Sequence, residues 1–217
     1  MTNIDFRLYL ITDRRLGDAS LLTAVRQALD GGVRAVQLRE KDLMAGELLK
    51  LAYKIRRLTE RYNARLFINS RFDLALAAGA DGVHLTQSGM PVDVVRGIVK
   101  KRLMIGVSTH SLKEARRAET GGADFITFGP VYRTASKAQY GAPVGLERLG
   151  EVSEKVKIPV FALGGVNIER CRKTMAAGVH GVSMISGIFG ADDVKNKAEA
   201  VLIALEGKGK TNMAKGC

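Results

Sequence analysis

Strict alternation of strand-like and helix-like segments is the feature that most constrains what this chain can fold into. Short apolar runs rich in β-branched residues alternate with segments whose apolar residues recur at helical spacing. Such alternation builds parallel βαβ units, so we expect an α/β fold whose sheet is covered by helices. The predicted strands are residues 7–12, 35–39, 65–69, 82–85, 103–107, 124–128, 159–163 and 181–185. The predicted helices are residues 21–30, 45–62, 72–78, 92–99, 112–120, 145–156, 168–177 and 192–205.

A short motif recurs along the chain and supports this count of strands. Its copies are residues 31–37, 78–84, 121–127 and 177–183, and the first reads Gly-Gly-Val-Arg-Ala-Val-Gln. In each copy a glycine is expected to end a helix, and the next residues begin a strand. The second glycine positions lie 47, 43 and 56 residues apart, which is two βα units each time. The motif therefore marks every second strand, as in an eightfold barrel with a residual twofold alternation.

These observations favour one closed barrel. We predict a (β/α)8 TIM barrel that forms a single domain over residues 1–206, followed by a disordered basic tail at residues 207–217. The chain has 217 residues and 46% hydrophobic residues, which is enough for one sizeable core. A doubly wound open sheet is the alternative. That fold usually carries a glycine fingerprint after its first strand, where this chain reads Ile11-Thr12-Asp13-Arg14.

Charge and cysteine content narrow the classes of function. The net charge of +12 fits a solvated basic surface or an anionic ligand, and no basic patch interleaved with aromatic residues points to nucleic acid. No apolar run approaches the ~20 residues that span a bilayer, and no signal-peptide pattern is present, so we expect a cytoplasmic protein. Cys171 and Cys217 provide neither a disulfide framework nor a metal-ligand spacing. The sequence leaves open whether the chain forms a homo-oligomer.

Two consecutive strand ends have the composition of a phosphate site. The run 158–163 ends in Gly164-Gly165 and is followed by Asn167, a plausible helix cap. The next strand ends in Ile185-Ser186-Gly187, which also exposes N–H and hydroxyl donors. The last two loops of a (β/α)8 barrel are where phosphate is usually held, so we predict a phosphate-binding cup there. A pair of tight strand-to-helix connections is the alternative interpretation.

Other strand ends are cationic and rich in amides and hydroxyls. Gln37, Arg39 and Lys41 alternate, so they would point together into the barrel mouth if their strand extends that far. The long connection 129–143 contains Thr134, Ser136 and Lys137, which could close over a phosphate as a lid. The three histidines lack the spacing of a metal triad, and we expect structural or supporting roles for them.

In combination, several motifs make the chain resemble the thiamine-phosphate synthase/TenI family from about residue 7 to residue 205. They include Gln37-Leu38-Arg39-Glu40-Lys41, Gly79-Ala80-Asp81-Gly82-Val83-His84-Leu85, Gly106-Val107-Ser108-Thr109-His110, Gly129-Pro130-Val131-Tyr132, Thr134-Ala135-Ser136-Lys137, Gly164-Gly165 and Ser183-Met184-Ile185-Ser186. The resemblance implies a (β/α)8 barrel and a transferase of thiamine biosynthesis. Synthases of the family join hydroxymethylpyrimidine diphosphate to thiazole phosphate and release diphosphate with Mg²⁺. The TenI branch includes thiazole phosphate tautomerases, which gives the alternative function.

The resemblance also assigns candidate site residues. The residues matched to the pyrimidine diphosphate side are Gln37, Arg39, Lys41, Asn69, Ser108 and Lys137, of which Arg39, Lys41, Ser108 and Lys137 are the candidate catalytic groups. The residues matched to the thiazole phosphate side are Thr134, Ser136, Gly165, Ile185 and Ser186. Fixed cations suit this chemistry because loss of diphosphate leaves a pyrimidinylmethyl cation and a departing anion.

Two departures from the family pattern concern magnesium. Synthases usually carry a carboxylate at each of two positions that are Ser70 and Gly89 in this chain, and these carboxylates hold the ion. Both carboxylates are absent here, and the run 88–91 resembles the TenI branch. The alternative function is therefore a TenI-type tautomerase or a non-catalytic thiazole-phosphate binder. However, the tautomerases typically have an acid-base histidine at the position of Pro130, and Gln37 keeps the synthase form.

Overall fold

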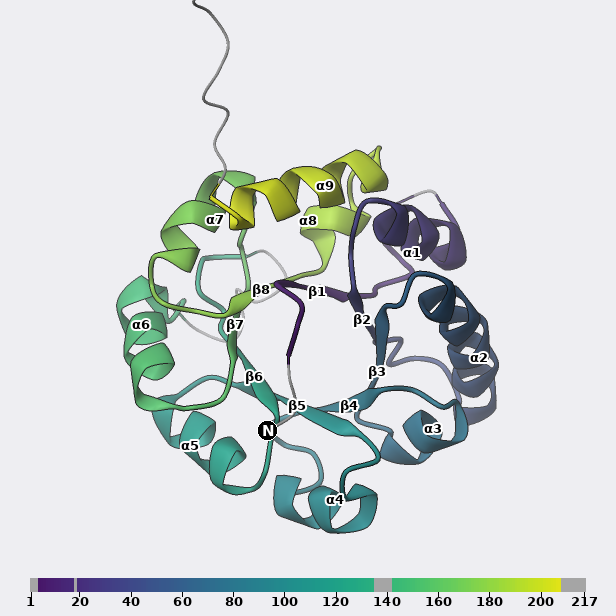
Figure 1. Ribbon diagram of the computed structural model, residues 1–217, viewed down its shortest axis with the longest axis horizontal. Coiled ribbons are helices and arrows are strands. Elements are labelled where there is room, and N and C mark those ends of the chain that lie inside the picture. The colour runs from purple at the N-terminus through teal and green to yellow at the C-terminus, as the bar shows by residue number, and fades with distance from the viewer. Residues whose placement is uncertain (1–3, 18, 135–141, 208–217) are drawn as a thin grey trace, which may run out of the picture.

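The computed structural model describes residues 4–17, 19–134 and 142–207 of the chain. The predicted strands form a closed, fully parallel barrel in chain order, with helices around its outside (Figure 1). The strands are β1 (Leu8–Ile11), β2 (Ala35–Leu38), β3 (Arg65–Asn69), β4 (Gly82–Leu85), β5 (Met104–Thr109), β6 (Phe125–Phe128), β7 (Val160–Leu163) and β8 (Gly181–Met184). The helices are α1 (Leu21–Asp30), α2 (Ala45–Arg61), α3 (Phe72–Ala77), α4 (Val92–Val99), α5 (Leu112–Thr120), α6 (Gly145–Lys155), α7 (Ile168–Met175), α8 (Ser186–Phe189) and α9 (Val194–Leu205).

The barrel closes because β1 pairs with both β2 and β8. Leu8 pairs with Val182 and Leu10 with Met184, so the doubly wound open sheet is excluded. The (β/α)8 prediction is therefore confirmed. In the described residues no helix is long and apolar enough to cross a membrane. The predicted tail from residue 208 onward and the candidate residues Ser136 and Lys137 lie outside the described residues.

Element boundaries differ from the predictions in three places that matter for the site. Strand β5 continues to Thr109 and so includes Ser108, whereas we expected it to end at residue 107. Strand β2 ends at Leu38, one residue earlier than expected. Helix α8 was not predicted, because its four residues are too few to show a helical period.

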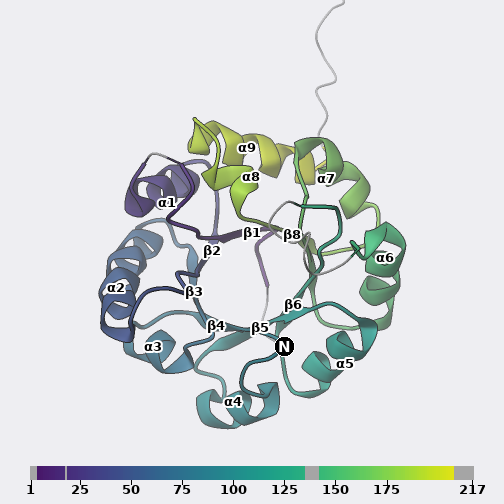
Figure 2. The ribbon, with the colours of Figure 1, turned by 180° about the vertical axis from the view of Figure 1, so that it is seen from behind.

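Aromatic rings fill the barrel interior at the end where the strands begin. Phe6, in the segment before β1, stacks on Phe161 with ring centroids 5.2 Å apart and meets Phe125 edge-on at 5.8 Å. This N-terminal segment crosses the barrel opening that faces the viewer in Figure 1. The rings of Tyr9 and Phe67 complete an apolar cluster at this end of the barrel. The opposite end, seen in Figure 2, is where the carboxyl ends of the strands lie.

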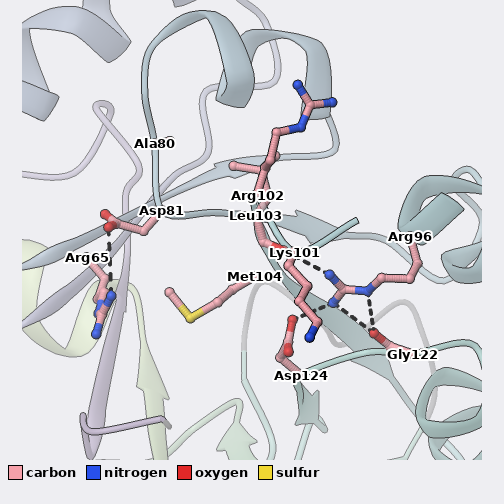
Figure 3. Close-up of a pocket in the computed structure, with 10 residues that line it drawn as sticks. All are labelled: Arg65, Ala80, Asp81, Arg96, Lys101, Arg102, Leu103, Met104, Gly122 and Asp124. Carbon is pink, nitrogen blue, oxygen red and sulfur yellow. Dashed lines mark hydrogen bonds and ion pairs between the residues drawn. The ribbon is translucent and has the colours of Figure 1, made fainter. Parts of the chain in front are cut away.

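The repeated motif builds the same clamp twice at the N-terminal end of the strands. Asp81 accepts a hydrogen bond from Arg56 Nη1 at 2.6 Å and another from the Leu66 amide at 2.8 Å. Asp124, at the matching position of the next copy, accepts one from Arg96 and one from the Ile105 amide. Each clamp ties a helix to two neighbouring strands. A cavity of about 690 Å³ lies beside these groups, at the end of the barrel opposite the candidate site. Figure 3 shows the side chains that line it.

Breaking one clamp should destabilise the protein measurably. We expect Asp81→Ala to lower the free energy of unfolding by about 2 kcal/mol, since a part-buried charge-assisted hydrogen bond and the partner of a strand amide are lost. Urea unfolding followed by circular dichroism measures this change. Glu60→Ala is the matched control, because Glu60 pairs with the same Arg56 at an exposed position and should cost less than about 0.5 kcal/mol. Equal losses in the two variants would contradict the clamp.

Candidate active site

The carboxyl ends of the parallel strands bring the predicted site residues to one end of the barrel. Asn69 is the last residue of β3, Ser108 lies near the end of β5, and Arg39 directly follows β2. Thr134, Gly165, Ile185 and Ser186 follow β6, β7 and β8. Residues spread over most of the chain therefore come together at one end of the barrel, the end that faces the viewer in Figure 2.

The backbone of Arg39 is linked through Thr12 to the buried carboxylate of Glu40, for which no role was predicted. The Arg39 amide donates to Thr12 Oγ1 at 2.9 Å, and the Thr12 hydroxyl donates to Glu40 Oε1 at 2.6 Å. Glu40 is only 4% exposed, and it also accepts from the Arg14 amide and pairs with the Arg14 guanidinium at 3.4 Å. This network fixes the start of the loop after β2.

The expected row of three alternating residues on one strand is not formed. Because β2 ends at Leu38, Arg39 and Lys41 lie in the following loop. Gln37 is buried inside the barrel, Arg39 is half-buried and Lys41 is exposed. The three residues thus occupy different depths, which strand periodicity cannot indicate.

Beneath the opening lies a chain of hydrogen-bonded polar side chains. Gln37 Nε2 donates to Tyr9 Oη at 3.1 Å, Tyr9 Oη lies 3.3 Å from His84 Nδ1, and His84 Nε2 lies 3.0 Å from Ser108 Oγ. Burial, assisted by the charge of Arg39, lowers the pKa of His84 to about 3. Burial also raises the pKa of Tyr9 well above its usual value. The ring of His84 is therefore neutral at physiological pH, and the four hydrogen-bonded side chains carry no charge.

The predicted phosphate cup is a loop of tightly packed glycines. Gly164 and Gly165 have φ of +96° and +67°, where a side chain is strained. The Tyr132 amide donates to Gly164 O at 3.0 Å, and a Cβ added at Gly165 would lie 2.8 Å from Tyr132 Cβ. The Asn167 side chain caps α7 by accepting from the Arg170 amide at 3.0 Å, as predicted. The loop after β7 is thus shaped by the loop after β6.

Ser70 and Gly89 occupy the two positions at which the resemblance implies magnesium ligands. Ser70 has φ of +60°, and its one neutral hydroxyl accepts from Asn69 Nδ2 at 3.1 Å. A Cβ added at Gly89 would lie 3.0 Å from Thr86 Oγ1 and 3.2 Å from Thr86 O. The nearby carboxylate of Asp73 is paired with an arginine. These residues do not fit an ion held by two carboxylates.

No group of three or more His, Cys, Asp or Glu side chains within the described ranges is placed to hold a metal. The three histidines make separate contacts, His84 with Tyr9 and Ser108. His110 Nδ1 contacts Gly129 O, and His180 Nε2 lies 3.1 Å from Phe6 O at the far end of the barrel.

Comparison with known proteins gives a consistent result. The family model described as thiamine monophosphate synthase matches residues 8–188. The thiamine-phosphate synthase of Clostridium acetobutylicum is 44% identical over 93% of this chain and 95% of its own length. That of Pyrococcus abyssi is 43% identical over 92% and 95%. The structure of a thiamine phosphate pyrophosphorylase from Pyrococcus furiosus superposes with a TM-score of 0.86 at 40% identity, covering 93% of this chain and 96% of that one.

Proposed function

Since the chain belongs to the thiamine monophosphate synthase family, we propose that it condenses hydroxymethylpyrimidine diphosphate with thiazole phosphate to give thiamine phosphate and diphosphate. It is then a transferase of thiamine biosynthesis. The observation that carries this proposal is the gathering of the family's matched residues at one end of a closed barrel. Each matched residue in the described ranges lies near the carboxyl end of its strand or in the loop that follows it.

In this proposal the two substrates occupy different parts of the opening. The diphosphate side is formed by Gln37, Arg39, Lys41, Asn69 and Ser108, with Lys137 added by the family match. The thiazole phosphate lies toward Thr134, Ser136, Gly165, Ile185 and Ser186. The bond between the pyrimidine methylene carbon and a diphosphate oxygen breaks, and that carbon bonds to the thiazole nitrogen. Cations fixed before the reaction stabilise the departing negative charge without further reorganisation.

The direct test is to incubate the purified protein with both phosphorylated substrates and to measure thiamine phosphate by its oxidation to fluorescent thiochrome phosphate. Formation that depends on both substrates supports the proposal. Binding of thiazole phosphate without any product would contradict it and would favour a binding role. The tautomerase alternative is not favoured, because the relatives compared are named as synthases and because Pro130 cannot replace an acid-base histidine.

Synthases of the family use Mg²⁺, so restoring one carboxylate should strengthen the response to that ion. We expect Ser70→Asp to lower the Mg²⁺ concentration for half-maximal turnover about tenfold, since an anionic oxygen replaces a neutral hydroxyl. Aspartate tolerates the positive φ of this position. Ser70→Asn is the matched control, because it has the same shape and no charge. An equal response of both variants would show that Ser70 does not lie at the metal position.

A further inference from the structure

The repeated motif places a polar residue inside the barrel at the same position of each copy. The last residues of the four copies are Gln37, His84, Thr127 and Ser183. Each is at most 2% exposed. Ala35 and Phe125, two residues earlier on β2 and β6, belong to the inner apolar cluster, so the period of a strand points Gln37 and Thr127 inward as well. We call these four residues the polar layer.

The polar layer is divided into bonded and unbonded members. Gln37 and His84 belong to the hydrogen-bonded chain that ends on Ser108. Thr127 Oγ1 and Ser183 Oγ are buried and have no hydrogen-bond partner in the described residues. Of the four residues, only Gln37 and His84 are therefore connected to the site by side-chain hydrogen bonds.

The donors and acceptors in this series of side chains fix the direction of each hydrogen bond. The Gln37 Nε2 amide can only donate, so Tyr9 Oη accepts from it and has its own proton available for His84 Nδ1. With Nδ1 accepting, the neutral imidazole carries its proton on Nε2, 3.0 Å from Ser108 Oγ. The Ser108 oxygen accepts this bond, and its own proton is left for a different acceptor. Ser108 is partly exposed at the barrel opening, so that acceptor lies on the site side.

We propose that His84 is a positioning residue that fixes the Ser108 hydroxyl as a hydrogen-bond donor toward an anionic oxygen of the substrate. Tyr9 and Gln37 set the tautomer of the ring that does this. The inference rests on the proposed function only for the identity of the anion, the diphosphate group. A serine whose hydroxyl can rotate freely would lose rotational entropy on binding, whereas one held by His84 is already oriented.

The tautomer is tested first, in the absence of substrate. Two-dimensional ¹H–¹⁵N NMR of the full chain labelled at its histidine nitrogens should show His84 with a protonated Nε2 and an unprotonated Nδ1. The signal is assigned by its loss in His84→Gln. A ring protonated on Nδ1, or on both nitrogens, at pH 7.5 would overturn the proposal, whatever reaction the protein performs.

The coupling of the two residues is tested by a double-mutant cycle on kcat, with affinity for inorganic diphosphate as the second readout. His84→Leu and Ser108→Ala should each lower kcat about tenfold, and the double variant should be no slower than Ser108→Ala. His84→Gln, whose amide can donate to Ser108, should recover most of the loss. Multiplicative effects in the double variant would contradict the proposal.

Ser183→Ala is the matched control, because it removes a hydroxyl from the same layer with no link to Ser108, and kcat should stay within twofold. If the parent forms no thiamine phosphate, the proposed function fails. The double-mutant cycle is then measured by affinity for inorganic diphosphate. The tautomer of His84 then decides whether the inference holds.

Discussion

Arg39→Ala should lower the rate of thiamine phosphate formation about 100- to 1000-fold, which is the loss typical of removing one fixed group that stabilises transition-state charge. Arg39 follows β2 at the opening of the barrel, and Thr12 and the buried Glu40 hold its backbone. The guanidinium that extends from this backbone can meet the departing diphosphate with two parallel hydrogen bonds. Steady-state kinetics with saturating substrates measure the change as a fall in kcat.

Two further variants make the result specific. Arg39→Lys keeps the charge but loses the planar, bidentate geometry, so we expect an intermediate rate. Arg26→Ala lowers the net charge equally from the exposed face of α1 and should stay within twofold of the parent. A rate for Arg39→Ala close to that of the parent would remove Arg39 from the diphosphate side of the proposed site.

The alternation and the repeat were sufficient to predict the barrel, because both express how the chain is built rather than what it binds. Parallel strands separated by helices can pack in few ways, and a motif on every second strand selects closure. Boundaries near the site were less predictable. Ser108 extends β5 because Thr109 pairs with Phe128 across the sheet, a contact that no local pattern indicates.

The candidate residues were predicted from the family resemblance together with the rule that the site lies at the carboxyl ends of the strands. That rule gives the end of the barrel but not the depth of a side chain. Gln37 was expected beside Arg39 and instead lies beneath it, bonded to Tyr9. Glu40 was noted only as part of a family motif, and the fold shows that it is buried against Thr12.

The internal repeat places side chains as well as turns at matching positions. Its aspartates, Asp81 and Asp124, form the clamps below the barrel. Its final positions form the polar layer, of which only Gln37 was predicted as a site residue. Glycine marks the same turn in each copy and can be interpreted locally, whereas the role of a polar side chain inside a barrel depends on its neighbours across the sheet. The roles of all the candidate site residues, Ser136 and Lys137 included, stay predictions.

Acidification should destabilise the parent more steeply than a His84→Gln variant. In the folded protein burial and Arg39 lower the pKa of His84 to about 3, while in the unfolded chain the ring should titrate near 6.5. Below about pH 6.5 the His84 ring therefore binds a proton in the unfolded state but not in the folded state. The free energy of unfolding falls by about 1.4 kcal/mol per pH unit in this window, or about 3 kcal/mol between pH 6.5 and pH 4.

The measurement is urea unfolding of both proteins at a series of pH values between 4 and 8. His84→Gln is expected to be less stable at pH 7.5, because its shorter reach weakens the bond to Tyr9. The informative quantity is the difference in slope, since the carboxylates that titrate in this range are common to both proteins and cancel. His180→Gln is the matched control, because burial also lowers the pKa of His180, but that ring is only half-buried and its slope should be smaller. Parallel curves for the parent and His84→Gln would mean that the folded protein accepts a proton on His84. A charged ring would donate from both nitrogens, so Nδ1 could no longer accept from Tyr9.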